Sequence, residues 1–185
     1  KPFDPSCLDS LGYGTQADVV TALEFERILS ATGPYSGELF KPSSMRGKKA
    51  VRTHPGKIAW LQCVGSRDIN CSDHSYCSSV CCMYTNKQTV IAKERSDKPL
   101  DTAVFFMDMR THGKEFEKYY NRTREEKGVR FIRSKVHTID PVENDNLRLR
   151  YVTEEGEIKE EEFDMVVLAV GLAPNKESVK LAKTV

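Results

Sequence analysis

Five of the six cysteines of this chain are crowded between positions 63 and 82. They are Cys63, Cys71, Cys77, Cys81 and Cys82, whereas Cys7 lies apart near the start. Thiolates bind iron–sulfur clusters and zinc, and pairs of thiols form redox centres or disulfides. The crowding therefore predicts a chemical site in this stretch, and four kinds of site have to be compared.

The spacing favours an iron–sulfur cluster. Cys77 and Cys81 are four residues apart and would share one face of a helix. Cys82 is turned by about 100° from Cys81, which still allows it to reach a cluster at the helix end. Cys63 follows an apolar run and would approach from a strand, and the positive end of the helix dipole favours an anionic cluster. These four cysteines supply the thiolates that a [4Fe–4S] cubane needs.

Zinc is the main alternative, with a tetrahedral ligand set of Cys71, His74, Cys77 and Cys81. That set leaves Cys63 and Cys82 without a role. A dithiol redox centre is less favoured because the sequence has no Cys-x-x-Cys, and the Cys77–Cys81 spacing is a poorer substitute. Disulfides are less favoured because clustered cysteines in a reducing compartment are more often ligands or redox groups.

Composition describes an ordinary globular chain. The 185 residues are 39% hydrophobic and 30% charged, with a net charge of +1. This length fits one domain, or one domain plus a piece of another. We expect no nucleic-acid partner, because no broad basic surface is indicated, and no membrane insertion, because no apolar run approaches about 20 residues. No signal peptide is visible, so we expect a cytoplasmic protein, and a fragment of a longer chain.

Strand and helix patterns alternate from residue 56 onward. Apolar runs predict strands at 58–61, 102–107 and 129–132, and helical spacing predicts helices at 78–94 and 114–127. Residues 136–139, 147–152 and 158–163 alternate apolar and polar side chains, as in an antiparallel meander, and 165–170 is a last buried strand. We therefore predict an α/β fold: a Rossmann-like parallel sheet with helices on both faces and a small antiparallel β-meander.

The first 55 residues are predicted to contain one amphipathic helix. Thr15–Asp18 has the spacing of a capping box, and a helix of about seventeen residues follows, ended by Gly33-Pro34. Residues 34–56 are rich in proline and glycine and are predicted to be a connector.

The loop after the 58–61 strand lies where this fold usually binds a dinucleotide. A dinucleotide site needs Gly-x-Gly-x-x-Gly there, and only Gly65 is present. The region is thus predicted to be a degenerate NAD(P)-binding-type domain, in which sulfur ligands take the place of the nucleotide.

Several motifs resemble the A subunit of heterodisulfide reductase. They are Gln62–Asp68 (QCVGSRD), Tyr76–Tyr84 (YCSSVCCMY) with Lys87, Gly12–Gly14, Leu23–Arg27, Phe106–Arg110 and Val170–Pro174. The resemblance covers nearly the whole chain. It implies the central, thioredoxin-reductase-like and cluster-carrying region of a flavoprotein that relays electrons between FAD and iron–sulfur clusters, in a complex with other subunits of a heterodisulfide reductase type.

The resemblance implies three parts: residues 1–55 as part of an FAD-type domain with a connector, 56–170 as the Rossmann-like cluster-binding domain, and 171–185 as a return segment toward the FAD-type domain. The resemblance implies FAD in the full-length protein. Its glycine-rich fingerprint is absent here, so this fragment is expected to bind FAD weakly or not at all. We expect an oxidoreductase subunit fragment that is not catalytically competent alone. The other function class is a zinc-stabilised structural or interaction domain.

The candidate metal ligands are Cys63, Cys77, Cys81 and Cys82, and the candidate cofactor-binding residues are Gly65, Arg67, Gly171 and Pro174. For Arg67 a structural salt bridge is favoured, with contact to a flavin phosphate or another anion at the strand end as the alternative. The segment from Val170 to Asn175 resembles the chain return between the two nucleotide domains of flavin disulfide reductases, with a hinge as the alternative. Cys7 and Cys71 are expected to be free thiols.

Overall fold

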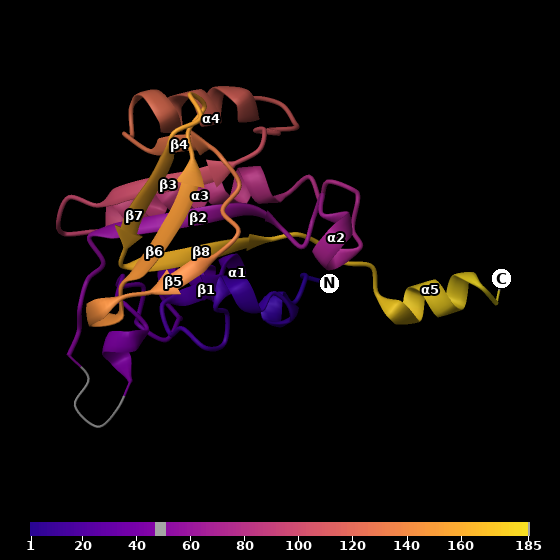
Figure 1. Cartoon of the computed structure of the whole chain (residues 1–185), viewed down its shortest axis with the longest axis horizontal. Coiled ribbons are helices and arrows are strands. Elements are labelled where there is room, and N and C mark those ends of the chain that lie inside the picture. Colours follow the sequence, from indigo (N-terminus) through magenta and orange to yellow (C-terminus); the bar gives the residue numbers. More distant parts are fainter. Residues whose placement is uncertain (47–50, 185) are drawn as a thin grey trace.

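A computed structural model describes residues 1–46 and 51–184 of the chain (Figure 1). Residues 47–50 of the predicted connector and residue 185 of the return segment lie outside the described residues. The centre is a five-stranded parallel sheet in the order β1-β8-β2-β3-β4. Its strands are β1 (Val19–Thr21), β2 (Lys57–Val64), β3 (Asp101–Phe106), β4 (Arg130–Arg133) and β8 (Met165–Val170). The middle strands β2 and β8 are almost wholly buried, which explains their continuous apolar sequence.

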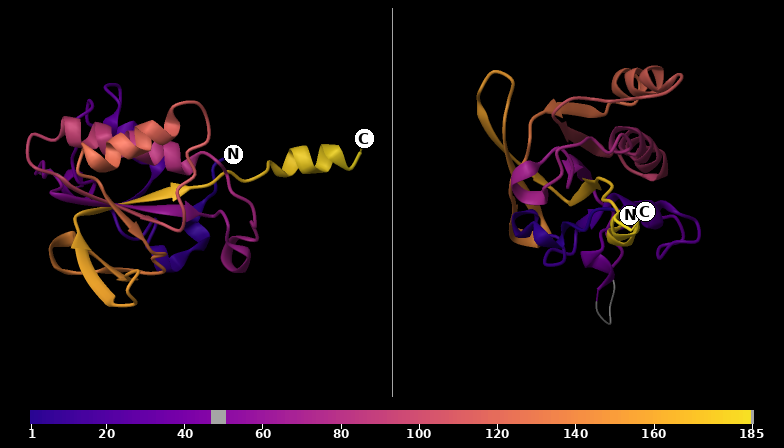
Figure 2. Two further views of the ribbon diagram at one scale, coloured as in Figure 1. Left: turned by 90° about the horizontal axis from the view of Figure 1, so that it is seen from above. Right: turned by 90° about the vertical axis from the view of Figure 1, so that its right-hand side faces the viewer.

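Three helices cover one face of this sheet (Figure 2). They are α1 (Ala22–Leu29), α3 (Cys81–Arg95) and α4 (Phe116–Glu125). Phe25 of α1 meets Trp60 of β2 edge to face, with ring centroids 5.3 Å apart. Tyr120 of α4 packs on Phe131 of β4 in the same way at 4.9 Å. These aromatic contacts fix the helices over the sheet.

A three-stranded antiparallel meander covers the other face. Its strands are β5 (Ile139–Pro141), β6 (Leu147–Val152) and β7 (Ile158–Phe163). Phe163 and Tyr151 both pack on Phe105 of β3, with ring centroids 6.0 and 5.0 Å apart. The predicted α/β class and the antiparallel meander are confirmed. The prediction of helices on both faces is wrong, because the meander takes the second face.

The N-terminal helix is shorter than predicted. Residues 19–21 form a strand, because they pair with Val166–Leu168 of the central strand β8. The capping box is formed by Thr21 and Glu24: the Thr21 backbone N–H donates to Glu24 Oε2 at 2.7 Å, and the Glu24 N–H donates to Thr21 Oγ1 at 3.3 Å. A β-branched pair, Val19 and Val20, favours the strand, so the N-cap is Thr21 instead of the predicted Thr15 and the helix starts six residues later.

Short helices complete the chain. The one-turn helix α2 (Ile69–Ser72) lies in the loop between Gly65 and Val80, and short 3-10 helices span Pro5–Cys7, Asp9–Leu11, Ser43–Met45 and Glu143–Asp145. Helix α5 (Lys176–Ala182), which was not predicted from the sequence pattern, extends away from the body (Figure 1). None of the helices in the described ranges is long and apolar enough to cross a membrane.

The N-terminal residues lie side by side with the segment that follows β8. Pro2 and Leu172 form an antiparallel bridge, and the Phe3 N–H donates to the Gly171 carbonyl at 2.9 Å. This pairing lies just past the carboxyl end of β8, beside the loop that carries the cysteines. The N-terminus therefore lies beside the segment that leads from β8 to α5 (Figure 2).

Candidate metal centre

Cys63 lies at a break in strand β2. The pairing of β2 with β8 shifts register between Leu61 and Val64, and Cys63 adopts a left-handed backbone conformation with φ 61°. This conformation is unfavourable for a residue with a Cβ by about 1–2 kcal/mol. Strain of this kind persists only where the surroundings enforce it, and it is frequent at functional sites.

The loop after β2 is ordered by its own hydrogen bonds. The Asp68 N–H donates to the His74 carbonyl at 2.8 Å, and the His74 N–H donates to the Asp68 carbonyl at 3.2 Å. The Ser66 and Ser78 hydroxyl oxygens lie 2.8 Å apart. These contacts fold the loop back on itself, so that Cys77 returns toward the strand end that carries Cys63.

Four thiols come together at the end of this loop. Cys63, Cys81 and Cys82 are buried and Cys77 is partly buried. Burial raises the pKa of the Cys63 thiol, and the nearby Cys82 and Cys77 raise it further. Burial also raises the pKa of Cys81 to about 12, with added contributions from the other three thiols. The structure thus places all four predicted cysteines within electrostatic reach of one another.

The start of α3 presents unpaired backbone donors at this site. Cys81 and Cys82 are its first two residues, and Val80 before them supplies no side-chain cap. The first N–H groups of a helix have no partner within the helix and favour a negatively charged group. The Arg110 N–H donates to Cys82 Sγ and the Ser79 N–H donates to Cys77 Sγ, both at 3.4 Å. Hydrogen bonds of this kind stabilise thiolates that hold a cluster.

Two arginines flank the thiols. Arg110 pairs with Asp108 at 3.1 Å, and Arg67 pairs with the same carboxylate. Arg67 lowers the pKa of Cys63, against the larger effect of burial, and Arg110 does the same at Cys82. The predicted salt bridge of Arg67 is confirmed, and its partner Asp108 follows β3 at the same edge of the sheet.

The residues of the alternative zinc set are not brought together in the described part of the chain. No group of three or more His, Cys, Asp or Glu side chains there is placed to hold one metal ion, and this holds equally for Cys63, Cys77, Cys81 and Cys82. Cys71 is exposed, and His74 Nδ1 lies 2.9 Å from the Gly65 carbonyl oxygen. Zinc would need sulfur ligands about 3.8 Å apart, given its short bonds to sulfur. A cubane carries one thiolate on each of four irons, so its thiolates stand further apart than those around a single zinc ion, and a cluster on the four cysteines stays a prediction.

Comparison with known proteins finds one matching family and several relatives. The family described as "Pyridine nucleotide-disulphide oxidoreductase" matches residues 100–184. The chain is 42% identical over 99% of its length to the A subunit of the H(2):CoB-CoM heterodisulfide,ferredoxin reductase of Methanothermobacter thermautotrophicus. It is 41% identical over 98% of its length to the iron-sulfur A subunit of the CoB--CoM heterodisulfide reductase of Methanocaldococcus jannaschii. The chain is therefore homologous to part of the heterodisulfide reductase A subunit.

Only part of each relative is matched. The chain covers 27% of the Methanothermobacter protein and 26% of the Methanocaldococcus protein. An Archaeoglobus profundus protein, named as similar to the heterodisulfide reductase A subunit, is 40% identical over 90% of the chain, which covers 25% of it. The chain spans about a quarter of the length of these curated relatives, and the sequence-based resemblance to the A subunit is confirmed.

The glycines predicted to bind a cofactor have close neighbours within the chain. Gly65 has φ 69°, and a Cβ there would lie 2.0 Å from the Phe3 ring. A Cβ on Gly171 would lie 2.6 Å from Ser78 Oγ. Pro174 is exposed beyond the bridge between Pro2 and Leu172. Both glycines therefore permit close packing around the cysteine loop, and a cofactor role for Gly65, Arg67, Gly171 and Pro174 stays a prediction.

Two contributors to the site were missed by sequence reasoning. The backbone N–H of Arg110 bonds Cys82, and the Tyr84 hydroxyl donates to the Val170 carbonyl at 2.7 Å. Burial raises the pKa of Tyr84 well above its ordinary value, and the neighbouring Cys81 adds to the effect. The position of Arg110 just after β3 was the one available indication, because carboxyl ends of parallel strands meet at one edge.

Proposed function

We propose that this region is the electron-transfer domain of an iron–sulfur flavoprotein, with a [4Fe–4S] cluster on Cys63, Cys77, Cys81 and Cys82. The single observation that carries the proposal is the gathering of these four thiols at the end of β2 and the start of α3. When bound, such a cluster accepts and releases single electrons. The proposal makes the chain part of an oxidoreductase.

The surrounding residues have defined tasks in this proposal. The N–H groups of Arg110 and Ser79 donate to sulfur and stabilise the thiolates. The Arg67 and Arg110 guanidinium groups offset negative charge, and Asp108 holds both of them in place. Burial of three of the four thiols limits contact with water. Because buried thiols resist ionisation, these compensating groups are needed for thiolate ligands to form there.

FAD is proposed to bind to flanking parts of the full-length protein. Pro2 and Leu172 pair beside the cysteine loop, and an apolar pocket of about 310 Å³ opens there between the starts of α1 and α3 and the end of β8. The exposed side chains of Val80 and Leu172 line that pocket. An FAD-type domain packed on this edge would bring the flavin close to the cluster.

We propose the same three parts as above: 1–55 with the FAD-type domain, 56–170 as the cluster-binding domain and 171–185 as the return segment. Strand β1 of the first part pairs with β8, so the parts share one sheet. Other subunits of a heterodisulfide reductase-type complex are the proposed partners, as the names of the relatives imply. A cytoplasmic location stays a prediction.

The test uses a matched pair of cysteine variants of the full-length protein, purified without oxygen. Wild type and Cys71→Ser are expected to contain equal amounts of iron and acid-labile sulfide in this region, whereas Cys82→Ser loses about four of each. Clusters elsewhere in a longer chain cancel in this difference. Zinc without sulfide, or loss of metal in Cys71→Ser but not in Cys82→Ser, would contradict the proposal.

A further inference from the structure

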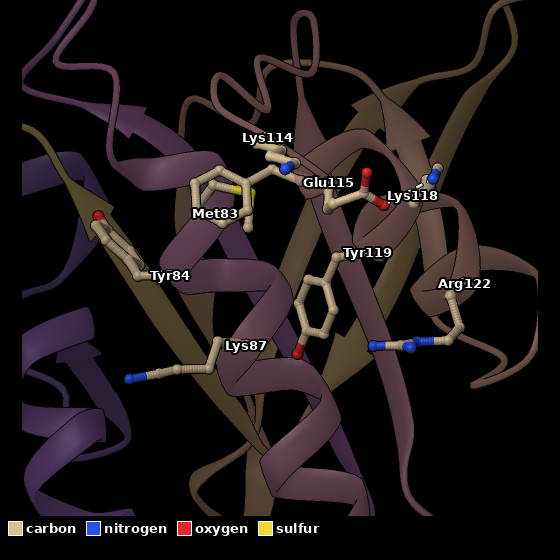
Figure 3. A pocket seen from close by; sticks show the side chains of 9 residues that line it. Met83, Tyr84, Lys87, Lys114, Glu115, Lys118, Tyr119 and Arg122 are labelled. Carbon is tan, nitrogen blue, oxygen red and sulfur yellow. Dashed lines mark ion pairs between the residues drawn. The ribbon is translucent and has the colours of Figure 1, made fainter.

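A surface groove runs between α3 and α4, separate from the cysteine site. It encloses about 630 Å³ and has an apolar floor made by Met83, Tyr84, Phe116 and Tyr119. Figure 3 shows Met83 and Tyr119 facing the same space from the two helices. Phe116 is 43% exposed, which is high for a large apolar side chain beside a groove. The floor is thus open to a binding partner.

The rim of the groove is basic. Its charged residues are Lys87, Lys114, Lys118, Arg122 and the single acid Glu115. Glu115 pairs with Lys118 at 2.7 Å, and Lys87 pairs with Glu26 of α1, also at 2.7 Å. Lys114 and Arg122 have no carboxylate partner among the described residues, and Arg122 lies over the Tyr119 ring at 5.3 Å. The chain has a net charge of only +1, so this positive charge is a local feature.

The groove begins at the cysteine site. Met83 directly follows Cys82 in the first turn of α3. The opposite wall includes Lys114, which follows Arg110 by four residues, and the Arg110 N–H bonds Cys82 Sγ at 3.4 Å. A molecule seated against Met83 would therefore contact the residue that directly follows Cys82.

We propose that this groove docks a small electron-carrier protein with an acidic surface. The inference rests on the proposed function, because it needs a cluster that can accept or release an electron. One electron would pass from the reduced carrier to the oxidised cluster, or from the reduced cluster to the oxidised carrier, with no bond formed or broken. Transient redox interfaces are small and are steered by opposite charge around an apolar centre. A small anion would require cations that converge on one point. The four cationic side chains of the groove are instead spread along its rim from Lys87 on α3 to Arg122 on α4, so an extended acidic surface fits them better.

The test measures binding of an oxidised two-cluster bacterial ferredoxin, an acidic protein, to the full-length cluster-loaded protein. The variant Lys114→Glu/Arg122→Glu is expected to bind roughly tenfold more weakly at about 0.01 M salt, because two attractions become repulsions. The difference should largely disappear at about 1 M salt, where charges are screened within a few ångström. The matched control Lys159→Glu, an exposed residue of β7 on the other side of the sheet, should bind like wild type.

Equal binding by wild type and the groove variant would overturn the inference, and so would an equal loss in the Lys159→Glu control. The same holds if the groove variant binds more weakly to the same extent at high salt. Reduction of the cluster by methyl viologen, a small cation that needs no docking site, reports on the proposed function separately. Absence of a reducible cluster would refute that function, while the binding comparison with oxidised ferredoxin would still decide the docking site.

Discussion

The loop from Cys63 to Cys82 and the meander from Ile139 to Phe163 both attach to the same parallel sheet, but different forces shape them. The meander buries alternate side chains, such as Leu147, Leu149 and Tyr151, against one face of the sheet. In the loop, Gly65 and Ser66 are the only buried residues between Val64 and Cys81, and three residues with a Cβ after Cys63 have positive φ: Arg67, Asp73 and Ser79. Apolar burial thus determines the meander, whereas hydrogen bonds and the cysteine positions determine the loop.

The largest effect is expected in the meander. Phe163→Ala should lower the free energy of unfolding by about 3–5 kcal/mol, because a fully buried ring that packs on Phe105 is lost. Ile158→Ala on the same strand, where the side chain is 71% exposed, should change it by less than about 0.5 kcal/mol. Urea denaturation of the metal-free protein measures both, and a similar loss in the two variants would show that burial does not determine the meander.

The cysteine loop and the meander each contain a glycine at positive φ, and replacing each of these glycines by alanine compares how closely the two regions are packed. Gly65→Ala should destabilise the metal-free protein by about 2–4 kcal/mol, because the new Cβ meets the Phe3 ring and the backbone is left-handed. Gly156→Ala in the β6–β7 turn meets no atom within 4 Å, so only the conformational term of about 1 kcal/mol applies. Equal losses would mean that Phe3 moves aside freely and that the loop is less closely packed than the structure shows.

The meander is also joined to the parallel sheet by ion pairs of Glu161 with Lys57 and Arg130. Burial raises the pKa of Glu161, but hydrogen bonds from Arg130 and Lys57 outweigh burial and hold the pKa below the ordinary 4.5. A carboxyl group with a depressed pKa stabilises the fold above its unfolded pKa, and this stabilisation is lost as the pH falls through the folded value. Glu161→Gln should therefore be less stable than wild type at pH 7 by about 1 kcal/mol, with the difference shrinking below pH 4. Denaturation curves from pH 7 to pH 3 would show a constant difference if these ion pairs are unimportant.

The smallest expected effect concerns backbone strain at Cys63. Cys63→Gly should be more stable than Cys63→Ala by roughly 0.5–1 kcal/mol in the metal-free protein, because glycine tolerates φ 61°. At position 103, in the interior of β3, glycine and alanine should show the opposite order: the variant Ala103→Gly should be less stable than wild type. If Cys63→Ala is the more stable variant, the loop does not hold residue 63 in the left-handed backbone conformation.

The regular parts of the fold could be predicted from the sequence because their causes are local. The run from Met165 to Val170 is apolar throughout, and β6 alternates, so period and burial identified both strands. The strand β1 was missed because it exists through pairing with β8, and its three residues fit a helical pattern equally well. The placement of helices on one face was missed because nothing local shows which face the meander covers.

The candidate site was predictable only where residue type carries the chemistry. The four thiols stood out by composition and spacing. In the structure three of them are buried, and neighbouring thiols help to raise the pKa of Cys63 and of Cys81, but a metal site on the four stays a prediction. The backbone donor of Arg110 and the bridge through Asp108 were not visible, since they depend on where β3 ends beside α3. The position of Phe3 over Gly65 was also not visible, because it depends on pairing between Pro2 and Leu172, which are far apart in the sequence.

The most direct test of the central claim is an anomalous diffraction experiment at the iron absorption edge on anaerobically grown crystals of the full-length protein. We predict iron density enclosed by the sulfur atoms of Cys63, Cys77, Cys81 and Cys82, with none at Cys71. A zinc signal beside Cys71 and His74, or protein density with no metal among the four cysteines, would contradict the account.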